Sequence, residues 1–135
     1  MLVATNSHEP VLTYADLHPG QHVSSMGSPG EIDESIFLGV DQIVAPSPDE
    51  EIDRHRPGVP PYSDGPLWRL VESGQLDRTS IVPLGALIQD QVKPRNGPGD
   101  INLFRDPRGG IGDVALAAWV YDRAVEQGLG IEVEF

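Results

Sequence analysis

The sequence predicts an α/β fold with an open sheet. Three short apolar runs carry this prediction, at residues 2–4, 22–26 and 42–45, and each is closed at once by residues that favour turns. Short strands of this buried type, joined by short connections, are typical of parallel sheets whose two faces are both covered.

Helices are expected between and after these strands. Residues 33–39 begin with acidic side chains and end at a glycine, and residues 66–73 begin with a proline and precede another glycine. Residues 82–89 fit either a short helix or a strand, and periodicity does not separate the two. Prolines and glycines in residues 53–66 predict an irregular surface loop.

The C-terminal part combines a strand with the clearest helix of the chain. Residues 101–104 are the predicted strand, and residues 113–127 the predicted helix. The first half of this helix is apolar almost all round, so we expect it to be covered on more than one side. Breaker residues at positions 93–100 place the expected domain boundary between residues 1–98 and 99–135.

Charge and composition exclude several function classes. The formal net charge of −12 disfavours nucleic acid and anionic membranes as partners, because the long-range field repels phosphate. The four histidines lack metal-ligand spacing and cysteine is absent, so no metal site is expected. The acidic run at residues 49–51 is predicted to be a solvated surface. We expect a cytoplasmic protein.

Four segments, in order, resemble one known family. They are ATNSHEPVL at 4–12, GQHVSSMGSPGEID at 20–33, DINLFRDPRGGIGDVALAAWVYDRA at 100–124 and EQGLG at 126–130. Together they resemble the C-terminal part of the ornithine cyclodeaminase/mu-crystallin family. The resemblance implies that residues 1–98 are the second half of a Rossmann-like NAD(P)-binding domain. Residues 99–135 would be a strand and helix that return to a missing N-terminal domain, which forms the substrate and dimerisation domain.

The same resemblance implies an activity. The family transfers hydride between NAD or NADP and the carbon that carries an amino or imino group, so the expected ligands are one of these dinucleotides and an amino or imino acid. Residues 1–135 contain no phosphate-binding G-x-G-x-x-G motif. We therefore expect the isolated chain to be inactive. The alternative is a non-catalytic protein that associates with itself as a homodimer or with a complementary N-terminal chain.

Candidate cofactor-binding residues follow from the strand ends. Thr5, Asn6 and Ser7 come directly after the first predicted strand, and ligands of open α/β sheets bind outside the carboxyl ends of strands. His22 and Val23 are candidates at the next strand by the same reasoning. The alternatives are an ordinary turn with a helix cap for the first group and a structural role for His22.

The candidate catalytic residues depart from the family pattern. Family members commonly carry an aspartate shortly after the glycine that Gly27 resembles, and no aspartate stands there in this chain. Arg105 and Asp106 replace a lysine–serine pair. Arg105, or Arg108 beyond it, would bind a substrate carboxylate, and Asp106 would act as acid or base. The alternative is a surface ion pair beside a glycine-rich turn.

Two further carboxylates could replace the missing aspartate. Glu31 and Asp33 follow Gly27 within a few residues. The alternative for both is the solvated start of a helix, where acidic side chains are favoured by the helix dipole.

Overall fold

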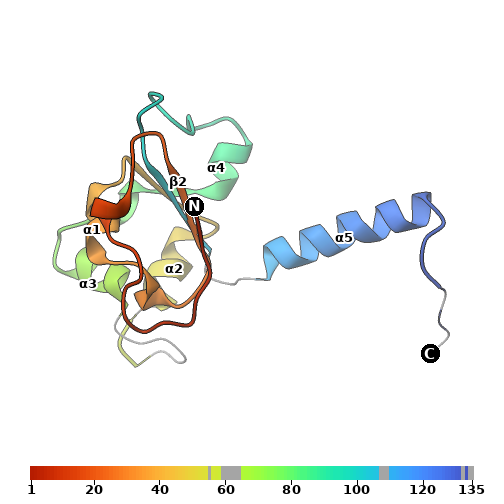
Figure 1. Ribbon diagram of the computed structural model, residues 1–135, viewed down its shortest axis with the longest axis horizontal. Helices are drawn as coiled ribbons and strands as arrows, with labels where there is room; N and C mark the ends of the chain where they lie inside the picture. Colours follow the sequence, from red (N-terminus) through yellow and green to blue (C-terminus); the bar gives the residue numbers. More distant parts are fainter. Residues whose placement is uncertain (55, 59–64, 107–109, 132, 134–135) are drawn as a thin grey trace.

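The protein is an α/β domain built on a parallel sheet (Figure 1). The computed structural model describes residues 1–54, 56–58, 65–106, 110–131 and 133. Its strands are β1 (Leu2–Val3), β2 (His22–Ser25), β3 (Gln42–Ala45), β4 (Ile81–Pro83) and β5 (Asn102–Arg105). They lie in the order β1-β2-β5-β3-β4, and each pair of neighbours is parallel. The predicted fold class is confirmed.

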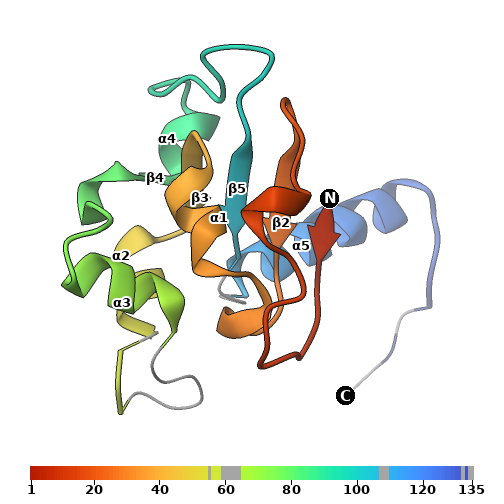
Figure 2. The same cartoon turned by 60° about the vertical axis from the view of Figure 1, so that its left-hand side comes forward.

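One face of the sheet carries the main core. Val23, Ile43 and Leu103 point to this side and are at most 4% exposed. Helices α1 (Glu34–Gly39), α2 (Pro48–Arg54) and α3 (Pro66–Glu72) cover it (Figures 1 and 2). Their buried residues are Ile36, Phe37, Ile52, Leu67 and Leu70. This packing accounts for the short apolar runs of the sequence.

The opposite face is covered less completely. The segment predicted as helix or strand is both, because β4 ends at Pro83 and α4 (Leu84–Ile88) follows at once. Leu84 and Leu87 of α4 line a pocket of about 580 Å³ together with Val44 and Phe104. These two strand residues alternate with Ile43 and Leu103, so α4 lies on the other side of the sheet from the main core.

Helix α2 corrects the expectation of a solvated acidic run. Residues 49–51 form its first turn, and the helix extends to Arg54, into the segment predicted to be irregular. Asp49 and Glu50 are exposed, but Glu51 is fully buried. Consecutive residues of an α-helix point to different sides of the helix, so three consecutive charged residues need not share one environment.

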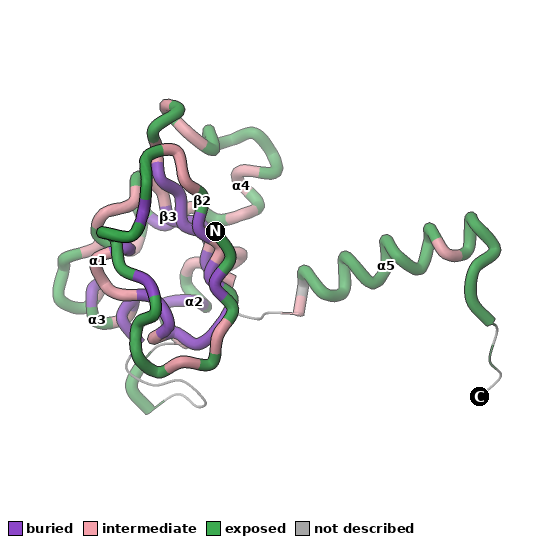
Figure 3. The backbone as a smooth tube through the Cα atoms, viewed as in Figure 1, coloured by how far each residue is buried: buried purple, intermediate pink, exposed green. Residues whose placement is uncertain are grey.

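Helix α5 (Ile111–Glu126) projects away from the sheet (Figure 1). Trp119, Val120 and Tyr121 are 52–69% exposed, and nearly all described residues of the helix are exposed (Figure 3). The expectation that this helix is covered is therefore not met within the described part of the chain. None of the described helices combines the length and the apolar character needed to cross a membrane.

The position of strand β5 in the sheet concerns the domain boundary predicted between residues 98 and 99. It lies in the middle of the sheet, between β2 and β3. Its residues therefore belong to the same sheet as the strands of residues 1–98. We propose that the boundary lies after β5, where the chain leaves the sheet toward α5, rather than between residues 98 and 99. The described residues also form three short 3-10 helices, at Tyr14–Asp16, Pro29–Glu31 and Arg78–Ser80.

Two neighbouring residues of α1 test the assignment of the core. Phe37 is 1% exposed and Leu38 is 48% exposed. Phe37→Ala should lower the free energy of unfolding by about 3–5 kcal/mol, because it removes a buried ring and leaves a cavity. Leu38→Ala should change it by less than about 1 kcal/mol. Urea unfolding followed by circular dichroism measures both, and equal losses would contradict the assigned orientation of α1.

Candidate active site at the carboxyl edge of the sheet

Three adjacent strands end at the same edge of the sheet. In the register of β1 and β2, Val3 lies opposite Ser25, and the pairing of β2 with β5 sets Ser25 opposite Arg105. Backbone bonds continue past the strands: the N–H of Ser28 donates to the carbonyl of Thr5, and the N–H of Asp106 donates to that of Ser25. The predicted residues Thr5 and Asp106 are therefore brought to one edge.

A buried carboxylate, Glu31, holds this edge together. Its Oε2 accepts hydrogen bonds from the Thr5 N–H at 2.7 Å and from the Thr5 hydroxyl at 2.9 Å. Its Oε1 accepts from the Ser25 hydroxyl and the Gly27 N–H, both at 2.7 Å. Gly27 has to lack a side chain, because a Cβ there would overlap with the Glu31 carboxylate and the Thr5 carbonyl. The Glu31 side chain is fully buried.

These contacts keep Glu31 ionised. Burial by itself raises the pKa of the Glu31 carboxyl, but the hydrogen bonds from Ser25, Thr5 and Gly27 together outweigh it, so the pKa lies below its usual value. The sequence is compatible with Glu31 as a proton-transfer group or as part of a solvated helix start. The solvated alternative is wrong, because every donor that surrounds the carboxylate comes from the folded chain.

Arg105 lies beneath the edge rather than on its surface. It is 2% exposed, and its Nε donates to Glu51 Oε1 at 2.8 Å. Its Nη1 donates to the Ser25 hydroxyl at 2.7 Å and lies 3.7 Å from Glu31. Its Nη2 donates to the Gly27 carbonyl at 3.3 Å. Arg105 is thus paired in the interior with carboxylates from elements far apart in the sequence, and it does not lie in a surface ion pair beside the glycine-rich turn.

The remaining candidates at this edge are more accessible. Asp106, directly after β5, is half-buried. Asn6 is exposed, and Ser7 donates from its hydroxyl to the Glu9 carbonyl at 2.7 Å while its own carbonyl accepts from the Ser28 hydroxyl. Arg108 lies outside the described residues. The structure therefore brings Thr5, Asn6, Ser7 and Asp106 to one edge.

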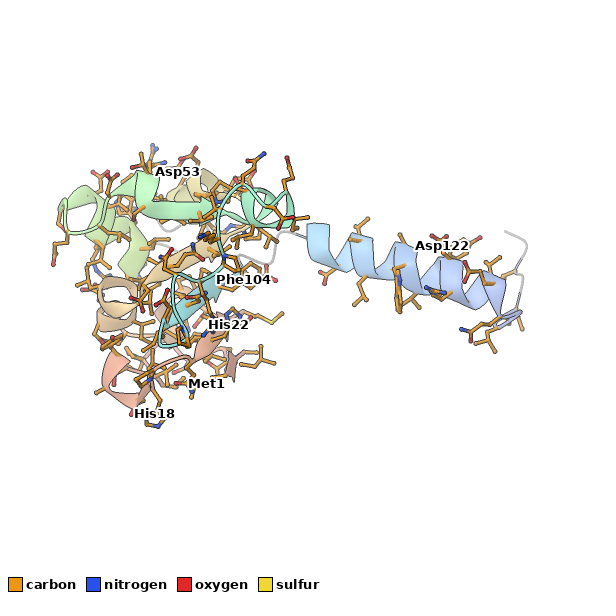
Figure 4. All side chains as sticks on the ribbon, turned by 90° about the horizontal axis from the view of Figure 1, so that it is seen from above. Met1, His18, His22, Asp53, Phe104 and Asp122 are labelled. Atoms are coloured by element: carbon orange, nitrogen blue, oxygen red, sulfur yellow. The ribbon has the colours of Figure 1, made fainter. Side chains whose placement is uncertain are left out.

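His22 and Val23 lie at the opposite end of the sheet. They begin β2, about five residues before Gly27, which is roughly 16 Å along a strand. Val23 is fully buried in the core, whereas His22 lines the pocket beside α4 with Phe104 (Figure 4). The predicted grouping of these two residues with Thr5 is not found, because the argument applies to the end of a strand and they form its start.

Sequence reasoning missed three members of the buried network. The sequence pattern predicts no role for Ser25, a solvated surface for Glu51, and for Arg105 either contact with substrate or a surface ion pair. No local pattern marks them, because Ser25 lies 80 residues from Arg105 and Glu51 lies 54 residues from it. Among the described residues, no group of three His, Asp or Glu side chains is placed to hold a metal ion.

Comparison with known proteins finds reductases and a cyclodeaminase among the relatives of this chain. A Delta(1)-pyrroline-2-carboxylate reductase from Bacillus thuringiensis subsp. konkukian is 26% identical over 140 aligned positions, which cover 100% of this chain and 40% of the relative. The structure of the Thermococcus litoralis Delta(1)-pyrroline-2-carboxylate reductase in complex with NADH and L-proline is 26% identical, with a TM-score of 0.72, over 98% of this chain and 39% of that one. The chain resembles the C-terminal part of ornithine cyclodeaminase-like enzymes.

A second solved structure supports the fold. The probable ornithine cyclodeaminase from Bordetella pertussis Tohama I has a TM-score of 0.70 at 23% identity, and the match covers 97% of this chain and 40% of that one. No protein-family model matches the chain. The resemblance predicted from the sequence is confirmed, and the chain spans about 40% of the length of the curated relatives it matches.

The Glu31 network predicts a large effect of an isosteric substitution. Each Glu31 oxygen accepts from a backbone N–H, so Glu31→Gln has to set an amide NH₂ against one of these donors. The variant should lose about 2–3 kcal/mol of unfolding free energy at neutral pH. Glu34→Gln is the matched control, because the Glu34–Arg69 ion pair is 41–46% exposed and should contribute less than about 1 kcal/mol.

The difference between wild type and Glu31→Gln should also depend on pH. Since the pKa of folded Glu31 lies below its usual value of 4.5, the carboxylate stabilises the fold fully above that value. The stabilisation is lost as the pH falls through the lowered pKa. Urea unfolding at several pH values measures this, and a difference that grew on acidification would contradict the assignment.

Removing the Arg105 guanidinium should lower the free energy of unfolding at least as much as Glu31→Gln does. Arg105→Met leaves the buried Glu31 and Glu51 carboxylates without their shared cation, and it should cost about 3–5 kcal/mol of unfolding free energy. Arg105→Lys keeps the charge but has fewer hydrogen-bond donors, so it should lose an intermediate amount of unfolding free energy. Arg69→Met, at an exposed ion pair, is the control in the same unfolding assay. A loss below about 1 kcal/mol for Arg105→Met would show that the network does not stabilise the fold.

Proposed function

We propose that residues 1–135 are the nicotinamide-side part of an NAD(P)-dependent enzyme that acts on an amino or imino acid. The observation that carries this proposal is the carboxyl edge of β1, β2 and β5. It is the edge at which parallel α/β sheets bind ligands, and here it gathers Thr5, Asn6, Ser7 and Asp106. The reductase of similar fold that binds NADH and L-proline supports the proposal.

The residues at this edge fit the nicotinamide half of a dinucleotide. Thr5 is half-buried with a hydroxyl at the edge, and the Asn6 amide is exposed. Such small polar groups allow a ribose or a carboxamide to approach the backbone closely. A bound NAD or NADP would supply hydride transfer, while the chain would orient the ring and the substrate. The sequence G-x-G-x-x-G does not occur in residues 1–135.

Asp106 is the proposed proton-transfer residue. It is half-buried, directly follows β5 and stands beside the edge. Glu31 is unsuited to this role, because all of its surrounding donors hold it as an enclosed carboxylate. Arg105 is proposed to support the edge through Glu31 and Glu51 rather than to bind substrate, since its guanidinium is 2% exposed. An acid or base must reach the reacting group, and only Asp106 of these three is accessible.

A non-catalytic role is the second candidate, and α5 is the observation that favours it. Val114, Leu116, Trp119 and Val125 are 58–70% exposed on this helix. Large exposed apolar patches mark interaction sites. In this case residues 1–135 would act by association, as a homodimer or with a complementary chain. We also propose a cytoplasmic location, with which the absence of cysteine is consistent.

Titration with NADH tests the first proposal. Residues 1–135 should bind NADH more weakly than micromolar, because the pyrophosphate-binding sequence G-x-G-x-x-G does not occur among them. Nuclear magnetic resonance should show shifted amide signals at Thr5, Gly27 and Asp106, with His22 at the far end of the sheet as internal control. Micromolar affinity would contradict the expected inactivity of the isolated chain. Shifts confined to the His22 end would contradict the assigned edge.

A further inference from the structure

We propose that Glu31 is a positioning residue that fixes the Thr5 hydroxyl as a hydrogen-bond acceptor toward the ligand. The group of the ligand that meets Thr5 is then a hydrogen-bond donor. This inference rests on the proposed function, which sets a pyridine dinucleotide at the carboxyl edge. It adds a specificity rule that follows from the direction of the hydrogen bonds in the buried network.

The direction of the hydrogen bonds is set first at Thr5. An ionised carboxylate only accepts hydrogen bonds, so the Thr5 hydroxyl has to donate its single hydrogen to Glu31 Oε2, at 2.9 Å. What remains on Thr5 Oγ1 is acceptor capacity. The N–H of Ser7 approaches this oxygen at 3.3 Å, which leaves room for one further donor. Thr5 is half-buried, so its side chain is in part accessible at the edge.

The direction cannot reverse, because Arg105 fixes the other side of the carboxylate. A guanidinium only donates, so Ser25 Oγ accepts from Arg105 at 2.7 Å and gives its own hydrogen to Glu31 Oε1 at 2.7 Å. Each Glu31 oxygen also accepts from a backbone N–H, of Thr5 or of Gly27. The carboxylate is therefore surrounded by donors and offers Thr5 only an acceptor.

The chemistry of the ligand group follows. An acceptor-only Thr5 disfavours a carbonyl or carboxylate oxygen at this point and favours an N–H or O–H group. The nicotinamide half of a dinucleotide carries both, in the carboxamide NH₂ and in the ribose hydroxyls. Both groups are hydrogen-bond donors, and an analogue of the dinucleotide distinguishes the carboxamide from the ribose. A dinucleotide whose carboxamide is replaced by an acetyl group has lost the N–H donor but keeps the ribose.

Two substitutions at Thr5 test the rule in the full chain. Thr5→Ser keeps the hydroxyl, and Thr5→Val keeps the branched shape and the backbone N–H but cannot accept. In an NADH titration followed by amide shifts, Thr5→Val should weaken binding about three- to tenfold, and Thr5→Ser should stay within about twofold of wild type. Equal affinities of the two variants would overturn the inference. If the acetyl analogue loses affinity for wild type but not for Thr5→Val, the donor is the carboxamide; otherwise it is the ribose hydroxyl.

A second readout needs no ligand. The amide protons of Thr5 and Gly27 should shift together with pH, at one midpoint below the usual pKa of a glutamate, since both donate to Glu31. Glu31→Gln should abolish the transition, and Glu34→Gln should leave it intact. Independent or absent transitions in wild type would overturn the positioning role. Absence of NADH-induced shifts at Thr5 would overturn the proposed function and with it the ligand, whereas an intact transition with equal affinities of Thr5→Val and Thr5→Ser would overturn this inference alone.

Discussion

The buried carboxylate of Glu31 is the interaction on which the carboxyl edge depends. It accepts from the loops that follow β1 and β2, and through Ser25 and Arg105 it is joined to β5 and α2. Burying an ionised group is costly unless donors surround it, and here they come from several elements. The arrangement therefore exists only when those elements are in place together, which links the packing of the sheet to the geometry of its carboxyl edge.

The two ends of the sheet differ in their side chains. At the carboxyl end, β2 finishes at Ser25, small polar residues follow β1, and the charged side chains of Glu31 and Arg105 are buried beneath this edge. At the amino end, His22 stands beside a pocket lined by Val44, Leu87 and Phe104. Because parallel strands all run in one direction, each kind of end is gathered on one edge. This polarity separates candidate residues that looked equivalent in the sequence.

Helix α5 and the sheet differ in how far their apolar side chains are buried. The main core is complete on one face of the sheet, with Ile36, Leu67 and Leu103 at most 1% exposed. Trp119 of α5, by contrast, is 58% exposed, and it contacts Arg123 of the same helix with 5.6 Å between guanidinium and ring centre. An apolar helix in water costs free energy unless a partner covers it. The α/β part thus accounts for the proposed cofactor edge, and α5 for the proposed association.

The local elements could be predicted from short stretches of residues, because breaker residues and short apolar runs act over a few positions. The runs at 2–4, 22–26 and 42–45 and the C-terminal helix lie where the pattern predicted them. The folded chain was needed to show that β5 is central in the sheet and that His22 stands at the amino end. It also showed that Glu31, Glu51 and Arg105 are buried. The partners in this network are up to 80 residues apart, and the environment of a charge is set by what folds around it rather than by its neighbours in the chain.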